Sequence, residues 1–263
     1  TRSMVSADAG SPSDPVNSEN QPLSWVANLG RGAMGLTFSE DGLEAKSVLL
    51  KRVTPAEESE GENNAGEEVV TEGYYLLNDG LSYTYQTVYD DGEEVTDQVT
   101  VESLESDGEE GQLFVLTTQE ITGEEPFQWT EVLRQTKEVR VVSYDYEDGK
   151  EFLDPSLLLM PSSIVPGREI ISGSRIRDEQ GRQMGFEVIA MKFAGFETIE
   201  VGAGVFEDCL RLETRSLNGY GGDLNGWTGS DWYAKGVGLV RSEWSDSFSA
   251  GSTELLEVQS IKE

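Results

Sequence analysis

Asp-Gly dipeptides recur through the N-terminal half of the chain, and they constrain the fold more than any other sequence feature. They begin at Asp41, Asp79, Asp91, Asp107 and Asp148. An Asp-Gly pair between alternating segments is a strong hairpin signal, because both residues tolerate the positive φ angles of tight hairpin turns. The sequence therefore predicts a chain that reverses direction repeatedly, with short antiparallel strands between the turns.

The segments between these turns have strand character. In residues 81–89, Leu81, Tyr83 and Tyr85 alternate with small polar residues. This period of two, with many β-branched and aromatic residues, is typical of a strand with one buried face. Similar segments follow at 95–104, 112–118, 127–133, 138–146, 169–177, 185–193, 198–201, 209–214, 230–233, 237–244 and 253–261.

Little helix is expected, since no long stretch keeps the 3.6-residue helical period. The one helical turn that the sequence predicts is at 154–160, where Asp154 would cap a helix that begins at Pro155. Residues 1–22 are polar and acidic with almost nothing to bury, so we expect a disordered tail there. Residues 23–263 are expected to form a single β-rich domain.

The number of strands favours a curved sheet. Open twisted sheets rarely exceed about ten strands, and a dozen or more are expected here. We therefore predict an all-β fold, in which an antiparallel meander curls into a barrel or half-barrel. A two-sheet β-sandwich is the alternative.

Charge and residue usage exclude several classes of function. The chain has 50 acidic and 19 basic residues, a net charge of −31, which disfavours binding to nucleic acids and to anionic membrane surfaces. No apolar run approaches the ~20 residues of a membrane span. There is no histidine, which removes the usual zinc sites, Ser-His-Asp triads and Cys-His dyads. The single cysteine, Cys209, is expected to be a buried free thiol. We therefore expect a protein that is not an enzyme.

Two motifs in the C-terminal half carry a resemblance to a known family. One is Val-Gly-Ala-Gly-Val-Phe-Glu-Asp-Cys at 201–209, and the other is Tyr-Ala-Lys-Gly-Val-Gly-Leu-Val at 233–240. With the Leu-Leu-Met-Pro and Pro-Gly spacing at 158–167, they resemble an uncharacterised family of secreted and lipid-anchored bacterial envelope proteins. The resemblance covers residues 155–261. Gly202 stands where proline is common in that family, and no lipid-attachment cysteine lies near the start.

The resemblance implies a curved antiparallel sheet, loosely similar to lipoprotein-carrier half-barrels, and a location in the cell envelope or outside the cell. The residues have a structural interpretation of their own. Gly202 and Gly204 suit a tight turn, and Phe206 can pack into the core. Gly236 and Gly238 allow a strand to bend.

Aromatic residues are the candidates for ligand contact, since aromatics on a concave sheet can stack on sugars or hold lipids. The glycine-rich segment 219–227 is expected to be an exposed contact loop. The candidate ligand-binding residues are Trp129, Tyr144, Tyr220, Trp227, Trp232 and Tyr233.

Acidic residues suggest two further sites. Asp-rich turns at 144–149 and 223–225 offer the oxygen ligands that calcium prefers, and calcium is the one cofactor left open. The calcium candidates are Asp145, Asp148, Asp223 and Asn225. Glycoside hydrolysis needs two carboxyl groups across a cleft, and Glu131 with Asp145 is the candidate pair.

Three functions therefore remain. The first is a non-catalytic secreted or surface module of the cell envelope that binds a protein, apolar or carbohydrate partner or acts as a subunit of a larger extracellular assembly. The second is a carrier of a hydrophobic ligand or lipid inside a half-barrel. The third, which the sequence favours least, is a carboxylate-dependent hydrolase.

Overall fold

The computed structural model describes residues 24–29, 32–37, 48–51, 66–105, 108–122, 127–147, 149–220 and 223–260. The chain divides into two compact units, 1–64 and 65–263, and each is described by itself. The predicted tail, 1–22, lies outside the described residues. That residues 23–263 form a single domain stays a prediction.

In the first unit, three short strands form an antiparallel sheet. They are β1 (Ser24–Leu29), β2 (Gly32–Thr37) and β3 (Val48–Lys51), in the order β1-β2-β3. The Asp41-Gly42 pair, predicted to form a turn, lies between β2 and β3, outside the described residues.

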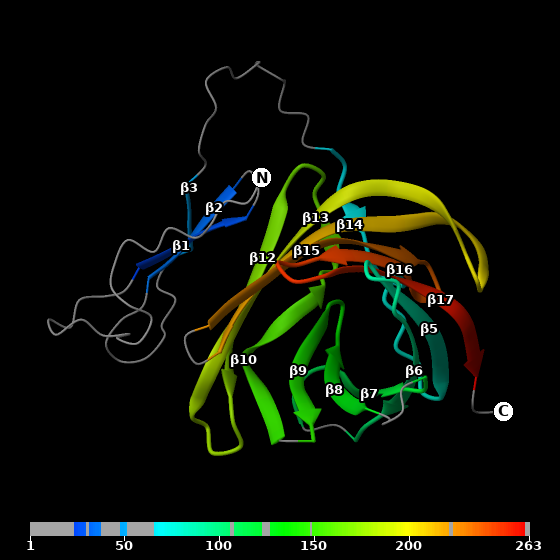
Figure 1. The fold of residues 1–263 in the computed structure, drawn as a ribbon, viewed down its shortest axis with the longest axis horizontal. Helices are drawn as coiled ribbons and strands as arrows, with labels where there is room; N and C mark the ends of the chain where they lie inside the picture. The colour runs from blue at the N-terminus through cyan, green and yellow to red at the C-terminus, as the bar shows by residue number, and fades with distance from the viewer. Residues whose placement is uncertain are drawn as a thin grey trace, which may run out of the picture. The chain divides into compact units, whose positions relative to one another are not determined.

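The second unit is a closed antiparallel barrel of twelve strands, which follow one another around the ring almost entirely in chain order. The ring closes where β17 pairs with β5 (Figure 1). The barrel strands are β5 (Leu81–Tyr89), β6 (Glu94–Ser103), β7 (Gln112–Glu120), β8 (Gln128–Gln135), β9 (Val139–Tyr146), β10 (Gly149–Met160), β12 (Glu169–Arg177), β13 (Gln183–Val201), β14 (Gly204–Tyr220), β15 (Asp223–Ala234), β16 (Gly238–Ser245) and β17 (Ala250–Ser260). The predicted all-β meander and the barrel are confirmed, and the described residues contain no helix.

The Asp-Gly pair at 91–92 forms a hairpin turn, as predicted. Gly92 (φ +88°) turns the chain between β5 and β6, and the Asp91 carboxylate accepts a hydrogen bond from the backbone N–H of Glu93 at 3.0 Å. Gly108 (φ +91°) lies between β6 and β7, and Gly149 (φ +146°) is the first residue of β10, while the aspartates that precede them lie outside the described residues. The pair at Asp79 differs from the prediction, because it forms a turn that leads into β5 rather than a hairpin.

Gly92→Ala is expected to lower the free energy of unfolding by about 1 kcal/mol, because an L-residue is strained at this φ although the space beside Gly92 is open. Gly173→Ala on β12 is the matched control. A Cβ there meets Val188 Cγ2 at an ordinary 3.5 Å, with no positive φ, so its effect should be close to zero. Urea unfolding compares the two, and equal losses would contradict the turn assignment.

The helical turn predicted at 154–160 is wrong, since β10 continues as a strand to Met160. The capping residues there are outweighed by packing, because Leu153 and Leu157 are buried in the core. The pairing of β10 with β9 shifts register between Phe152 and Leu157. Proline, which lacks a backbone N–H, is tolerated in such an irregular stretch of a sheet.

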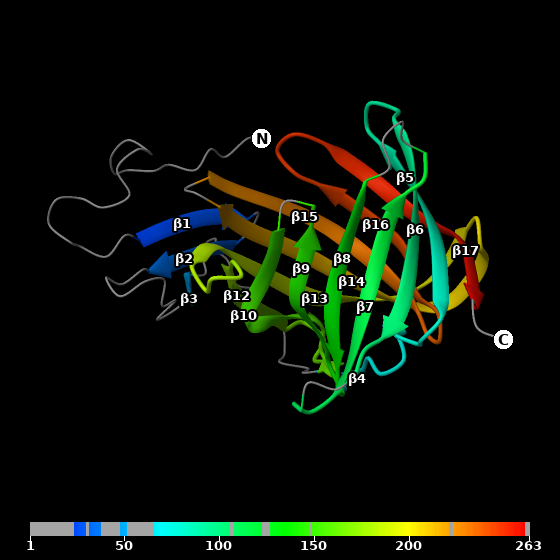
Figure 2. The same ribbon diagram turned by 90° about the horizontal axis from the view of Figure 1, so that it is seen from below.

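One end of the barrel is covered by the tip of a long hairpin and by residues 71–77, which precede β5 and which we call the covering segment. The β13–β14 hairpin turns at Gly202 and Ala203, as predicted, and curves toward β17 (Figure 2), where the N–H of Ala203 donates to the carbonyl of Leu255 at 2.9 Å. The short strands β4 (Val69–Val70) and β11 (Ser163–Ile164) pair with each other in an antiparallel arrangement.

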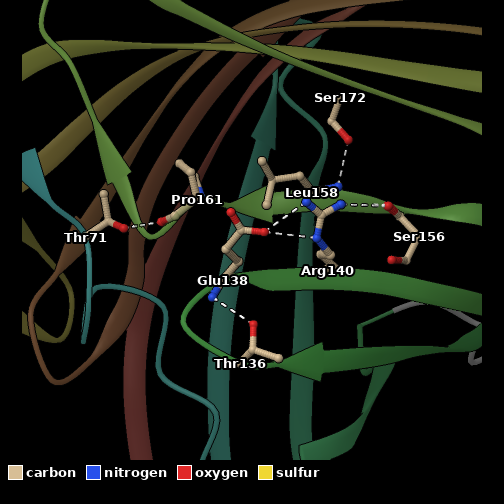
Figure 3. Close-up of polar contacts among 8 residues, drawn as sticks. All are labelled: Thr71, Thr136, Glu138, Arg140, Ser156, Leu158, Pro161 and Ser172. Atoms are coloured by element: carbon tan, nitrogen blue, oxygen red, sulfur yellow. Dashed lines mark hydrogen bonds and ion pairs between the residues drawn. The ribbon is translucent and has the colours of Figure 1, made fainter. Parts of the chain in front are cut away.

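Polar contacts tie the strands at this end together (Figure 3). The Thr71 hydroxyl donates to the carbonyl of Pro161. The N–H of Leu158 donates to the Ser172 hydroxyl at 2.9 Å. Arg140 donates to the Glu138 carboxylate at 2.9 Å and to the carbonyl of Ser156 at 3.1 Å. These bonds anchor β9, β10 and β12 where the covering segment meets them.

Candidate ligand site inside the barrel

Strand register sorts the barrel side chains into inward and outward sets, because neighbouring residues on a strand point to opposite faces. Tyr144 on β9 donates a hydrogen bond to Glu187 on β13 at 3.3 Å. Strands β10 and β12 separate β9 from β13 in the ring, so this contact crosses the interior. Glu131 pairs with Tyr144 across β8 and β9, and it therefore faces inward with its i±2 neighbours Trp129 and Leu133.

The half of the interior nearest the covered end is packed with apolar side chains, and we call it the closed half. Tyr74 and Leu77 from the covering segment and Ile164 from β11 contribute to this core. The fully buried apolar side chains on the inward face of the barrel strands are Val101, Leu133, Val141, Leu157, Ile176, Leu210, Leu212, Val240 and Leu255.

The other half of the interior is less completely filled. Its large aromatic and acidic inward side chains keep accessible surface, although they face the inside of a closed barrel. Eight strands enclose a space that side chains can just fill, and barrel diameter grows with strand number, so twelve strands leave additional room. We define the open half by its inward residues Tyr89, Trp129, Glu131, Tyr144, Tyr146, Glu151, Glu187, Trp227, Asp231 and Trp244.

The structure places five of the six predicted ligand residues on the inward face. Trp129, Tyr144 and Trp227 belong to the open half. Tyr220 lies at its rim, where its hydroxyl donates to the Glu151 carboxylate at 3.0 Å. Tyr233 lies deeper and is buried, with its ring 5.9 Å from that of Tyr75. Whether these residues bind a ligand stays a prediction.

Trp232, the sixth, points outward. Its ring lies between the guanidinium groups of Arg211 and Arg241, at 5.1 and 5.6 Å from the ring centre. Its indole N–H donates to the Glu197 carboxylate at 2.9 Å. Trp232 is therefore a packing residue of the outer wall, apart from the other five.

The segment 219–227 is not a loop. Gly219 already pairs with Leu224, and only residues 221–222 separate β14 from β15. The glycine at 219 has a packing role, since a Cβ there would lie 2.6 Å from the Phe186 ring. Close approach of an aromatic ring, rather than loop flexibility, explains this glycine.

The candidate hydrolase pair does not face across a cleft. Glu131 points inward, whereas Asp145 adjoins the inward Tyr144 on β9 and points outward. Of the calcium candidates, Asn225 is on the inward register, and Asp148 and the Asp223 side chain lie outside the described residues. Where the structure is described, no three His, Cys, Asp or Glu side chains group closely enough to hold a metal ion.

Sequence reasoning missed most of the acidic residues that share this interior. In the described part of the barrel, every Lys and Arg on the twelve strands is on the outward register. The alternation along each strand was the signal that could have found the acids, as Trp129, Glu131 and Leu133 illustrate. The inward carboxylates are Asp97, Glu120, Glu131, Glu151, Glu187 and Asp231.

Burial inside the barrel raises the pKa of several of these carboxyl groups. Burial raises the pKa of Glu131 to about 7, and the charge of Glu187 adds to the effect. Burial also raises the pKa of Glu187, while the hydrogen bond from Tyr144 opposes the shift. For Asp231, burial raises the pKa against hydrogen bonds from Ser242 and Thr214, at 2.7 and 2.9 Å. The open half therefore concentrates carboxyl groups that are costly to ionise without a cation nearby.

Cys209 is not part of this site. It is fully buried, as predicted, its thiol donates to the carbonyl of Phe206 at 3.4 Å, and burial raises its pKa. We expect no reaction with a thiol reagent such as Ellman's reagent in the native protein and one thiol titrated in denaturant. Rapid reaction of the native protein would contradict the packing around Cys209.

The fold and interior define a closed antiparallel β-barrel, with one half packed by apolar side chains and another half whose large inward side chains are only partly buried. Residues 171–251, from within β12 into β17, match the DUF3108-like family model. No curated protein matches the chain. An α-helix with the length and apolar character of a membrane span does not occur in the described residues.

Two solved structures are similar to this chain. One is a candidate exported protein with a YmcC-like fold from Bacteroides fragilis NCTC 9343, with a TM-score of 0.48 and 15% identity over 70% of this chain and 98% of that chain. The other is a candidate lipoprotein from Parabacteroides distasonis ATCC 8503, with a TM-score of 0.46 and 14% identity over 73% of this chain and 99% of that chain.

Proposed function

We propose that this protein is a non-catalytic binding module of the cell envelope or exterior, and that it holds a small ligand in the open half of its barrel. The observation that carries the proposal is the set of inward aromatic and polar side chains that keep accessible surface inside a closed ring of strands. Pockets that combine aromatic walls with a few polar groups are the usual form of small-molecule sites.

The aromatic residues suit such a role because their rings are spread around the open half. Trp129 lies on β8, Tyr144 on β9, Trp227 on β15 and Trp244 on β16. The Tyr89 and Trp244 rings meet edge to face at 5.7 Å, which fixes their orientation. A ligand that enters this half would contact rigid apolar faces on several sides.

The proposal of an envelope location rests on the motifs at 201–209 and 233–240. They form parts of the hairpin tip and of the β15–β16 turn, where Gly236 and Gly238 have φ angles of +77° and +111°. They therefore support a shared fold with the secreted and lipid-anchored family that they resemble. Fractionation of the source cells with an antibody against the protein tests the location, and recovery in the cytoplasm would contradict it.

Native mass spectrometry of protein purified without detergent from its source cells tests the binding function. We expect a mass above that of the polypeptide, which disappears on denaturation. Trp129→Ala combined with Trp227→Ala should lower the bound fraction, because it removes two walls of the open half. Phe152→Ala is the matched control, since Phe152 is a half-exposed aromatic residue on the outer face of β10.

The controls separate interior binding from binding elsewhere. Retention of the bound compound in the double variant, or its loss in Phe152→Ala alone, would place the compound outside the barrel. Purified protein that carries no compound at all would count directly against the proposed function.

A further inference from the structure

The interior of the barrel has an unbalanced charge. Among the side chains that the structure describes on the barrel strands, six carboxyl groups face inward, and all the lysine and arginine residues face outward. On the outer wall these cations have partners, as the pairs of Arg211 with Glu197 at 2.9 Å and Lys192 with Glu213 at 3.8 Å show. Within the described residues, the inward carboxylates have no such cationic partner from the protein.

Glu131 is the clearest case. The protein encloses its side chain, although some accessible surface remains, and among the described residues it makes no hydrogen bond or ion pair. The titratable groups that face it are Glu187 from β13, Tyr144 from β9 and Tyr75 from the covering segment. None of them is a cation. An enclosed carboxylate without a donor is costly, so this position is suited to a donor that comes from outside the protein.

Two further polar atoms beside Glu187 also lack partners. Asn218 on β14 pairs directly with Glu187, and its buried Oδ1 accepts no hydrogen bond. Ser216, two residues away on the same inward face, is 0% exposed, and its Oγ has no partner. Ser216 pairs with Trp227 on β15. Buried polar atoms are rarely left unpaired, so these atoms are an independent sign that a ligand with hydrogen-bond donors occupies this region.

The chemistry of these atoms selects among cations. A calcium site built by the protein gathers six to eight oxygen ligands, and among the described residues no three acidic, histidine or cysteine side chains converge. The surrounding aromatic faces instead attract organic cations, which gain from cation–π contact and from burial of their carbon atoms. An ammonium group also supplies the N–H donors that Glu131 and Asn218 lack.

We propose that the open half of the barrel binds an organic ammonium ion with an apolar body. The ammonium group lies between Glu131 and Glu187, and the apolar body lies against Trp227 and its neighbouring aromatic residues. This inference rests on the proposed binding function and names the chemical class of its ligand.

Calorimetric titration of the whole protein with three six-carbon probes tests the inference. The probes are hexylammonium, hexanol and hexanoate, which share an apolar body and differ in charge. We expect hexylammonium to bind at least about tenfold more tightly than hexanol, because a charged hydrogen bond is stronger than a neutral one. Hexanoate should not bind, since it adds an anion to an acidic interior.

Glu131→Gln keeps the shape of the side chain and removes its charge. It should weaken hexylammonium binding about tenfold and leave hexanol binding unchanged. Glu102→Gln is the matched control, because Glu102 is exposed on the outward face of β6, and it should leave both affinities unchanged. The native circular dichroism spectrum of each variant checks that it is folded.

The outcomes distinguish the inference from the proposed function. Equal binding of hexylammonium and hexanol overturns the cation inference and leaves an apolar carrier standing. An equal loss of hexylammonium affinity in Glu102→Gln and Glu131→Gln also overturns it, because the effect is then general electrostatics. No binding of any probe overturns the inference, while a compound retained in native mass spectrometry would still support the proposed function.

Discussion

Leu133→Ala is expected to lower the free energy of unfolding by about 2–5 kcal/mol, whereas Trp129→Ala on the same face of β8 should lower it by only about 1 kcal/mol. Leu133 is 0% exposed and belongs to the closed half, where the neighbouring side chains are also fully buried. Its truncation leaves a cavity that the surrounding strands cannot fill. Trp129 keeps accessible surface, although its ring contacts Phe127 at 5.6 Å.

Chemical unfolding of the two variants measures this difference directly. A buried tryptophan in a packed core would cost about 3–5 kcal/mol on truncation to alanine, more than most leucines. We expect the larger loss of stability for Leu133→Ala, whereas a uniformly packed barrel would show the larger loss for Trp129→Ala. A loss for Trp129→Ala as large as that for Leu133→Ala would show that the open half is filled by side chains.

Glu131→Gln is expected to stabilise the protein above neutral pH, by up to about 3 kcal/mol, and to have little effect at about pH 4. The pKa of Glu131 rises from its ordinary 4.5 to about 7 in the folded protein, because burial and Glu187 disfavour its charge. Between these two values the folded state binds more protons than the unfolded state. The wild type therefore loses stability as pH rises from about 4.5 to 7, and the glutamine variant avoids this loss.

Thermal unfolding at about pH 4 and about pH 8 measures the effect, with Glu102→Gln as the control. The burial-raised pKa values of Glu187 and Asp231 act in the same direction, so some decline with pH should persist in Glu131→Gln. A variant that is destabilised at pH 8 would mean that the Glu131 carboxylate makes a favourable contact in the folded protein.

Much of the fold was predictable because its signals are local. Asp91-Gly92 marks a hairpin through residues that tolerate positive φ, and Leu81, Tyr83 and Tyr85 alternate along one strand. These patterns depend only on neighbouring residues, so the order of the strands followed from them. Closure of the ring did not follow from local patterns, because it depends on the pairing of β17 with β5, which joins the two ends of the barrel sequence.

Two of the wrong local predictions have a common cause. Asp154-Pro155 looks like a helix start, and the glycines at 219–226 look like a loop, because each pattern is common in those settings. Tertiary packing determines the conformation of both segments. Leu157 is drawn into the core of the closed half, and Gly219 makes room for the Phe186 ring.

The candidate site was only partly visible in the sequence. Trp129, Tyr144 and Trp227 attract notice as aromatic residues, but Trp232 does so equally and faces outward. Among 50 acidic residues, Glu131 and Glu187 are distinguished only by the direction in which they point. That direction depends on strand register and on bulges such as the one between Val132 and Leu133, which no single strand reveals.

The most direct test of ligand binding in the open half is the NMR spectrum of the tryptophan indole N–H groups, recorded while a small-molecule extract of the source cell envelope is added. The chain has five tryptophans, and Trp129, Trp227 and Trp244 face the open half while Trp232 lies on the outer wall. We predict that the signals of Trp129, Trp227 and Trp244 shift and that the Trp232 signal stays in place. Unchanged signals from the three inward indoles, or a shift confined to Trp232, would contradict binding inside the barrel.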